Sequence, residues 1–280
     1  MQKKQMNSNV IHNYCKLRIS AFVLPLLLLG FIILWLYSKN ALNINEYVEL
    51  QKNSFVYINH TLSQYPYLQN NLTQFGDALV FLSFLGILVI YAPKIWEVLL
   101  PASMVSLLFC SSLKRIFAVP RPAVMIDNDS FVIIGKKLSG SNSLPSGHSI
   151  TIFTILTILM FAFIPQKTKY KMVYSISILT FGLVLAFSRV GVGAHYPIDV
   201  ISGSIIGYIS GLIGIFISIR YKIFNWIGKI KYYPIILLFL LISGISLINR
   251  IITDNLIVYY LAFASVVISF YKIICVYVKK

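Results

Sequence analysis

Three short stretches of this sequence carry side chains that could hold and attack a phosphate group. They are segments 114–122, 145–148 and 188–199, which read KRIFAVPRP, PSGH and SRVGVGAHYPID. Between them they offer three cations for phosphate oxygens, two histidines, one carboxylate and a Ser-Gly turn. Such a set can bind a phosphoryl group, attack it and protonate a leaving group without a metal ion.

The third stretch pairs a histidine with a carboxylate. If a helix begins near Tyr196, Asp199 lies one turn from His195 and can accept a hydrogen bond from one ring nitrogen, which leaves the other free to react. Taken alone, the pair is explained more simply by Asp199 capping the helix. Arg189 favours the chemical interpretation, because a guanidinium near lipid is costly without a partner.

The second stretch opens an apolar segment that we expect to be helical. The first amides of a helix have no helical partner and the dipole there is positive, so Ser146 and Gly147 can face an anion. His148 then lies just inside the helix and can give a proton to a leaving oxygen. A serine cap followed by a solvated histidine explains this motif equally well on its own.

The first stretch carries two further cations. Lys114 and Arg121 are seven residues apart, and Pro120 is expected to end the helix so that Arg121 turns back over the site. Lysine offers a point charge and arginine a planar fork for phosphate oxygens. Taken singly, such residues more often extend toward a membrane interface. We interpret Arg115 and the pair 136–137 as surface charges.

The chain as a whole has the composition of a membrane protein. Its 280 residues are 58% apolar and only 11% charged, whereas soluble domains are about a quarter charged. The apolar runs are long enough to cross a bilayer as helices. We predict an all-α, polytopic transmembrane helix bundle. The eight predicted spans are about 19–37, 77–93, 96–116, 147–165, 172–189, 197–219, 233–250 and 256–275.

The basic residues predict an orientation. With the N-terminus in the cytoplasm, fifteen of the 24 Lys and Arg residues fall on the cytoplasmic side, as the positive-inside rule requires. All three stretches then lie together on the opposite face. The net charge of +16 does not indicate nucleic-acid binding, because the lysines fall between apolar runs rather than in one stripe. The first apolar run lacks a convincing cleavage site, so we interpret it as a retained span.

Several features predict how the site is supported. We divide the chain into an N-terminal tail, first span and outside segment (1–54), a core that contains the three stretches (55–219) and a C-terminal hairpin (220–280). Apolar residues at helical spacing over 55–65 fit a surface helix or a simple loop equally well. Asp77 is expected to cap a helix rather than act as a catalytic acid. Gly203, Gly207 and Gly211 recur every four residues, which predicts close packing against a neighbouring helix.

Taken together, Lys114 and Arg121-Pro122, the segment 145–148, and Ser188-Arg189 with His195 and Asp199 resemble the signature of the type 2 phosphatidic acid phosphatase superfamily over about residues 55–219. The resemblance implies a six-span phosphatase core, to which this chain adds two extra C-terminal spans. It also implies that His195 is a nucleophile forming a phosphohistidine and that Asp199 orients it. It implies that His148 protonates the leaving group and later activates water. Lys114, Arg121, Arg189, Ser146 and Gly147 would bind the phosphate, with no metal and no cofactor.

These observations lead to a lipid phosphatase of a bacterial inner membrane as the first hypothesis, with its site facing the periplasm. Undecaprenyl pyrophosphate and lipid A are the expected substrates, since each joins a buried tail to a phosphate. Possible glycosylation sequences at Asn71 and Asn128 leave a relative in the endoplasmic reticulum open. A lipid-to-lipid phosphotransferase with the same site and a non-enzymatic transporter are the alternatives.

Overall fold

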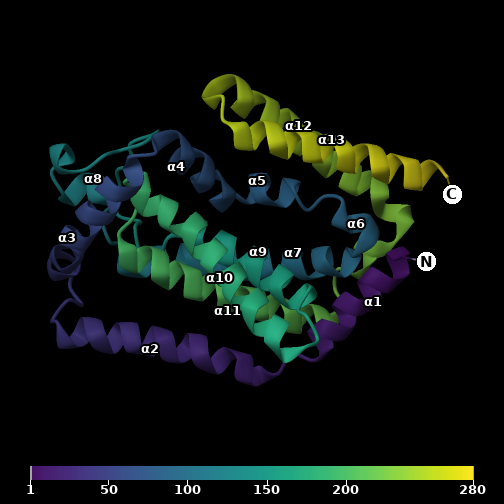
Figure 1. The fold of residues 1–280 in the computed structure, drawn as a ribbon, viewed down its shortest axis with the longest axis horizontal. Coiled ribbons are helices and arrows are strands. Elements are labelled where there is room, and N and C mark those ends of the chain that lie inside the picture. Colours follow the sequence, from purple (N-terminus) through teal and green to yellow (C-terminus); the bar gives the residue numbers. More distant parts are fainter. Residues whose placement is uncertain (1, 280) are drawn as a thin grey trace.

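The protein is a bundle of helices (Figure 1), seen here in a computed structural model that describes residues 2–279 and the side chains of residues 5–279. Those residues contain no β-strand. The longer helices are α1 (Gln2–Cys15), α2 (Val23–Ser38), α3 (Ile44–Ser63), α7 (Pro93–Phe117), α9 (Gly147–Ala162), α10 (Thr168–Gly191), α11 (Pro197–Tyr221), α12 (Tyr233–Asp254) and α13 (Ile257–Val278). The shorter ones are α4 (Pro66–Thr73), α5 (Ala78–Ser83), α6 (Leu88–Tyr91) and α8 (Pro122–Met125).

Among the described residues, six segments are long and apolar enough to cross a membrane, which confirms the predicted membrane helix bundle. They are Ile19–Ser38, Pro93–Met125, Thr168–Gly191, Pro197–Tyr221, Ile230–Asp254 and Ile257–Val278. The central helix α9 is shorter, with 16 residues, and most of its side chains are buried in the bundle. Of the residues counted for orientation, Lys280 lies outside the described residues, as do the side chains of Lys3 and Lys4.

The prediction of one continuous span over residues 77–93 is wrong. That stretch forms the short helices α5 and α6, which are joined by turns at 84–87 with hydrogen bonds from residue i+3 to residue i. Two neighbours favour the break. The Trp96 indole donates to the Leu85 carbonyl oxygen at 2.8 Å, and Gly86 lies so close to Ser269 of α13 that a Cβ would be 2.9 Å from its hydroxyl.

The α9–α11 contact brings two of the predicted stretches together, and it is as close as the glycine spacing predicts. A Cβ on Gly203 would lie 2.6 Å from the Ser146 carbonyl oxygen, and one on Gly211 would lie 3.0 Å from that of Thr154. Where the two helices begin, the Ser146 amide donates to the Asp199 carbonyl oxygen at 3.0 Å. The glycines therefore let the N-terminus of α9 meet the N-terminus of α11.

The C-terminal hairpin of α12 and α13 covers α5 on the opposite side of the bundle from α2 (Figure 1). Arg250 of α12 forms an ion pair with Asp77 at 2.9 Å, and the Asn71 side chain accepts from the Val258 amide at 3.0 Å. Asp77 also accepts from the Leu79 amide at 2.9 Å, so it caps α5 as the sequence predicted. The hairpin thus holds the segment that joins α4 to α5.

Helices α1 and α3 lie at opposite ends of the bundle (Figure 1). At the α1 end, the Tyr14 hydroxyl donates to the Ile158 carbonyl oxygen at 3.1 Å. At the other end, Phe55 of α3 is fully buried and packs edge-on against Phe131 and Tyr196. Residues 55–63 are therefore helical rather than a loop, since α3 ends at Ser63, and one face of this helix supports the core. The division at 1–54, 55–219 and 220–280 stays a prediction; α3 crosses its first boundary.

Candidate phosphate-binding site

The three stretches meet at one end of the bundle. Nη1 of Arg121 lies 3.4 Å from Nε2 of His195, which joins the first stretch to the third. A Cβ built on Gly147 would lie 3.6 Å from Nζ of Lys114, which places the first stretch beside the second. Segments from three parts of the chain therefore share one site, as the sequence predicted they should.

Asp199 is fully buried and held by three donors. Its Oδ2 accepts from the Ser143 hydroxyl at 2.6 Å and from the Tyr196 amide at 3.0 Å. Its Oδ1 accepts from the Tyr47 hydroxyl at 2.7 Å. Nδ1 of His195 then lies 3.5 Å from Oδ2 of Asp199 and 3.4 Å from the Ser143 hydroxyl. The carboxylate faces one ring nitrogen, and the other faces Arg121.

Arg121 reaches the site because α7 ends just before it. The helix stops at Phe117, Ala118 takes a left-handed conformation with φ of 45°, and the chain turns before Pro120. The guanidinium then donates from Nε to the Asn142 side chain at 2.7 Å and from Nη1 to the Ala194 carbonyl oxygen at 3.1 Å. These hydrogen bonds hold the buried Arg121 guanidinium beside Nε2 of His195.

Arg189 enters the site from the last turn of α10 and is also buried. Its Nη1 donates to the Thr73 hydroxyl at 2.7 Å, while its Nε is buried with no hydrogen-bond partner among the described residues. Among residues 5–279, whose side chains are described, no carboxylate lies within ion-pairing distance of Lys114, Arg121 or Arg189. Buried cations that form no ion pair are costly, and three of them gather around one carboxylate, so the arrangement suits an additional anion.

The turn between α10 and α11 is tied to α3. The Asn59 side chain donates to the carbonyl oxygens of Val132, Val190 and Gly191 at 2.9–3.1 Å and accepts from the Val132 amide at 2.8 Å. Gly193 has φ of +76°, and a Cβ there would lie 2.7 Å from the Val132 carbonyl oxygen. Only glycine fits this close approach, which lets the chain return from Arg189 to His195.

The start of α9 supplies the second histidine. His148 lies in the first turn, half-buried, within electrostatic range of His195 and of all three cations. Ser146 is fully buried and caps the helix, since its hydroxyl accepts from the Ser149 amide at 3.4 Å and from the Ser149 hydroxyl at 2.9 Å. Gly147 follows it in the first turn, where amides have no helical partner.

The environment of His195 keeps its ring neutral. Burial is the largest cause that holds the pKa of His195 well below its usual value, and the nearby positive charges of Arg121, Arg189 and Lys114 add to it. A neutral imidazole retains a lone pair for attack. Burial and the charge of Asp199 raise the pKa of Tyr47, so its hydroxyl stays a donor. Within the described residues, no three His, Cys, Asp or Glu side chains are grouped so as to hold a metal ion.

Four residues near the site were not predicted from the sequence as site residues: Tyr47, Thr73, Asn142 and Ser143. Tyr47 and Thr73 come from α3 and α4, far along the chain from any of the three stretches. Ser143 lies in the loop just before the second stretch, where it is fully buried and bonded to Asp199. A serine directly before a Leu-Pro-Ser-Gly-His run was the one local signal.

A membrane-spanning helix bundle with a buried His-Asp pair among three cations defines a class of integral membrane proteins built to handle an anionic group. The PAP2 superfamily model matches residues 96–226, which contain all three stretches. This match supports a lipid phosphatase.

Solved structures and curated proteins give two further comparisons. A crystal structure of Aquifex aeolicus LpxE is similar, with a TM-score of 0.49 and 26% sequence identity, over 59% of this chain and 94% of that chain. No curated protein matches the chain.

Proposed function

We propose that the protein is a membrane lipid phosphatase that hydrolyses a phosphate mono- or diphosphate ester of a lipid through a phosphohistidine on His195. One observation carries the proposal: Nε2 of His195 faces the Arg121 guanidinium at 3.4 Å while Nδ1 faces Asp199 at 3.5 Å. One ring nitrogen is thus directed at the place where phosphate oxygens would lie, and the other is oriented by a carboxylate.

In the first step, Nε2 of His195 attacks phosphorus and the bond to the lipid oxygen breaks. His148 gives a proton to that leaving oxygen, and the lipid departs as an alcohol or, from a diphosphate, as a monophosphate. Lys114, Arg121 and Arg189 stabilise the charge on the three remaining phosphoryl oxygens, together with the Gly147 amide. Asp199 stabilises the positive charge that develops on the His195 ring.

In the second step, water attacks the phosphohistidine. His148, now unprotonated, takes a proton from that water, the phosphorus–nitrogen bond breaks and inorganic phosphate leaves. His195 returns to its neutral form, and the low pKa of His195 favours this return. The three cations supply the positive charge that the reaction needs, so the proposed mechanism uses neither a metal nor a cofactor.

A lipid of the undecaprenyl pyrophosphate or lipid A type is the proposed substrate. The cations lie where membrane-spanning segments end, so a phosphate there can remain attached to a tail in the bilayer. The excess of Lys and Arg on the side of the N-terminus supports a site that faces the periplasm of a bacterial inner membrane. The proposed partners are the lipid and the membrane, with no nucleic acid.

Phosphate release from a panel of phosphorylated lipids, each supplied alone, tests the function. We expect the purified wild-type protein to release inorganic phosphate without an acceptor lipid and with chelator present. We expect His195→Ala to lose most of the rate and His148→Ala to lose about 10²–10⁴-fold. His12→Ala is the matched control, since His12 is exposed on α1 at the other end of the bundle.

A radiolabelled phosphoryl group trapped on wild-type protein but not on His195→Ala would support the intermediate. Unchanged turnover in His195→Ala, or activity abolished by chelator, would overturn the proposed chemistry. Phosphate released only when a second lipid is added would favour the phosphotransferase.

A further inference from the structure

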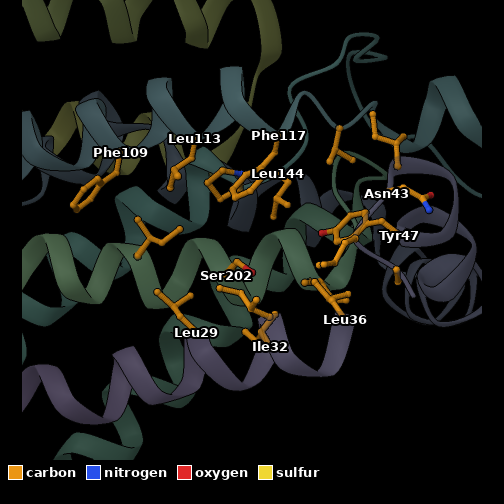
Figure 2. A pocket seen from close by; sticks show the side chains of 18 of the residues that line it. Leu29, Ile32, Leu36, Asn43, Tyr47, Phe109, Leu113, Phe117, Leu144 and Ser202 are labelled. Atoms are coloured by element: carbon orange, nitrogen blue, oxygen red, sulfur yellow. The ribbon is translucent and has the colours of Figure 1, made fainter. Parts of the chain in front are cut away.

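An apolar groove runs between α2, α7 and α11, with a cavity of about 550 Å³. Figure 2 shows side chains of α2 directed toward α7 across the groove, with Ser202 of α11 between them. The main contributors are Leu29, Ile32 and Leu36 of α2 and Phe109, Leu113 and Phe117 of α7. Its size lies within the range of about 300–1,000 Å³ that is usual for small-molecule sites.

The groove is accessible from the lipid side of the bundle. Helix α2 belongs to a membrane-spanning segment, and two groove residues on it, Leu26 and Ile33, are 55% and 59% exposed. Of the lining residues, only Asn43, Tyr47 and Ser202 carry polar side chains. Ordered water needs two to four polar partners, so the groove suits a hydrocarbon chain better than water.

One end of the groove is made of residues that adjoin the site. Tyr47 lines the groove, and its hydroxyl donates to Asp199 at 2.7 Å. Leu144 and Pro145 line it as well, and the residue before them, Ser143, donates to the same carboxylate. Ile198, the neighbour of Asp199 in sequence, completes this end. A hydrocarbon chain in the groove would therefore contact the residues that hold the Asp199 carboxylate.

We propose that one hydrocarbon chain of the phosphorylated lipid substrate occupies this groove and packs against Tyr47. The inference rests on the proposed function and adds the place of the tail. The groove ends beside the candidate site, which favours the substrate over an unrelated bilayer lipid as the occupant. Tyr47 would contact the hydrocarbon tail and also donates to Asp199. The same residue therefore contributes to binding of the tail and to orientation of the His195–Asp199 pair.

Filling the groove tests the proposal kinetically. Leu29→Trp adds bulk inside the groove, whereas Leu34→Trp adds the same bulk on the 68%-exposed outer face of α2. The substrates are long-chain phosphatidic acid and a short-chain phosphatidic acid that is soluble as a monomer. We expect Leu29→Trp to raise KM for the long-chain substrate about tenfold, the equivalent of displacing roughly two methylenes. KM for the short-chain substrate should not change, and Leu34→Trp should match the wild type.

Equal KM values in the two variants on long-chain substrate would overturn the groove assignment while leaving the phosphatase intact. Wild-type protein that releases no phosphate from phosphatidic acid, undecaprenyl pyrophosphate or lipid A would instead contradict the proposed function, so the two failures are distinguishable.

Photolabelling of the wild-type protein avoids any effect of mutation on folding. The probe is phosphatidic acid with a diazirine in one acyl chain, in phosphatidylcholine vesicles, compared with phosphatidylcholine carrying the same diazirine. We expect the phosphatidic acid to label the groove segments of α2 and α7 and unlabelled phosphatidic acid to compete. Equal labelling by both probes would make the occupant a bilayer lipid and overturn the proposal. Labelling confined to the smaller cavity of about 260 Å³ between α5, α7 and α9 would overturn it too.

Discussion

Gly76 lies directly against the imidazole of His148, so closely that a Cβ on Gly76 would overlap the His148 side chain. Gly76 belongs to the 3₁₀ turn Gln74–Gly76 that joins α4 to α5. Thr73, the last residue of α4, directly precedes this turn and accepts from Arg189 at 2.7 Å. One short connection, itself held by the Arg250–Asp77 ion pair, therefore positions both a proposed proton donor and a proposed phosphate ligand.

Gly76→Ala is expected to displace His148 without removing any reacting group. The overlap involves Cβ, Cγ and Cδ2 of His148, so the whole ring must move rather than a flexible end. We expect kcat to fall about 10²-fold, the lower part of the range for loss of general acid catalysis. Steady-state kinetics measure this loss. Gly244→Ala is the matched control, because a Cβ there would make only ordinary contacts at 3.7 Å; an unaltered kcat in Gly76→Ala would contradict the role of this contact.

Tyr47→Phe is expected to lower kcat through Asp199. The change removes one of three donors to a fully buried carboxylate, a loss of about 1–3 kcal/mol, while the ring that lines the groove remains. kcat should therefore fall, with KM for a long-chain substrate nearly unchanged. Tyr57→Phe on the same helix is the control, since Tyr57 is 75% exposed. A rise in KM with kcat unaffected would show that the hydroxyl serves binding and not the carboxylate.

The pH dependence of kcat/KM should report the neutral ring of His195. Because burial and the positive charge of Arg121 lower the pKa of His195, its reactive form persists below the usual titration range, and the acid limb should lie below about pH 6.5. Arg121→Gln removes a positive neighbour, so the pKa of His195 should rise and the limb should move to higher pH. Arg121→Lys keeps the charge and should leave the limb near its wild-type position.

The wild type, Arg121→Gln and Arg121→Lys are compared on one substrate, so that protonation of its phosphate affects all three pH profiles equally. Both variants will lose activity because the guanidinium fork is gone, and only the position of the limb bears on the electrostatic argument. Identical limbs in Arg121→Gln and Arg121→Lys would refute it.

The sequence predicted which residues lie close together better than it predicted the elements that support them. His148, His195 and Asp199 could be grouped because each lies next to a turn that its neighbouring Gly or Pro residues indicate. Tyr47 could not, since nothing near residue 47 indicates a partner at residue 199, and only the tertiary fold brings them together. The break at 84–87 was missed for a similar reason, because its cause lies in side chains of α7 and α13.

The packing of α9 on α11 can be tested by stability rather than activity. A Cβ on Gly207 would overlap the Ile150 carbonyl oxygen, and backbone cannot move aside as a side chain can. We expect Gly207→Ala to separate the two helices and to destabilise the protein by about 1–3 kcal/mol, seen as a lower thermal unfolding midpoint in detergent. Gly30→Ala on α2 has open space within 4 Å and should not lower the midpoint, since alanine favours a helix more than glycine does. If Gly207→Ala were as stable as Gly30→Ala, the α9–α11 contact could not depend on the missing Cβ, and the positioning of Ser146 beside Asp199 would need another cause.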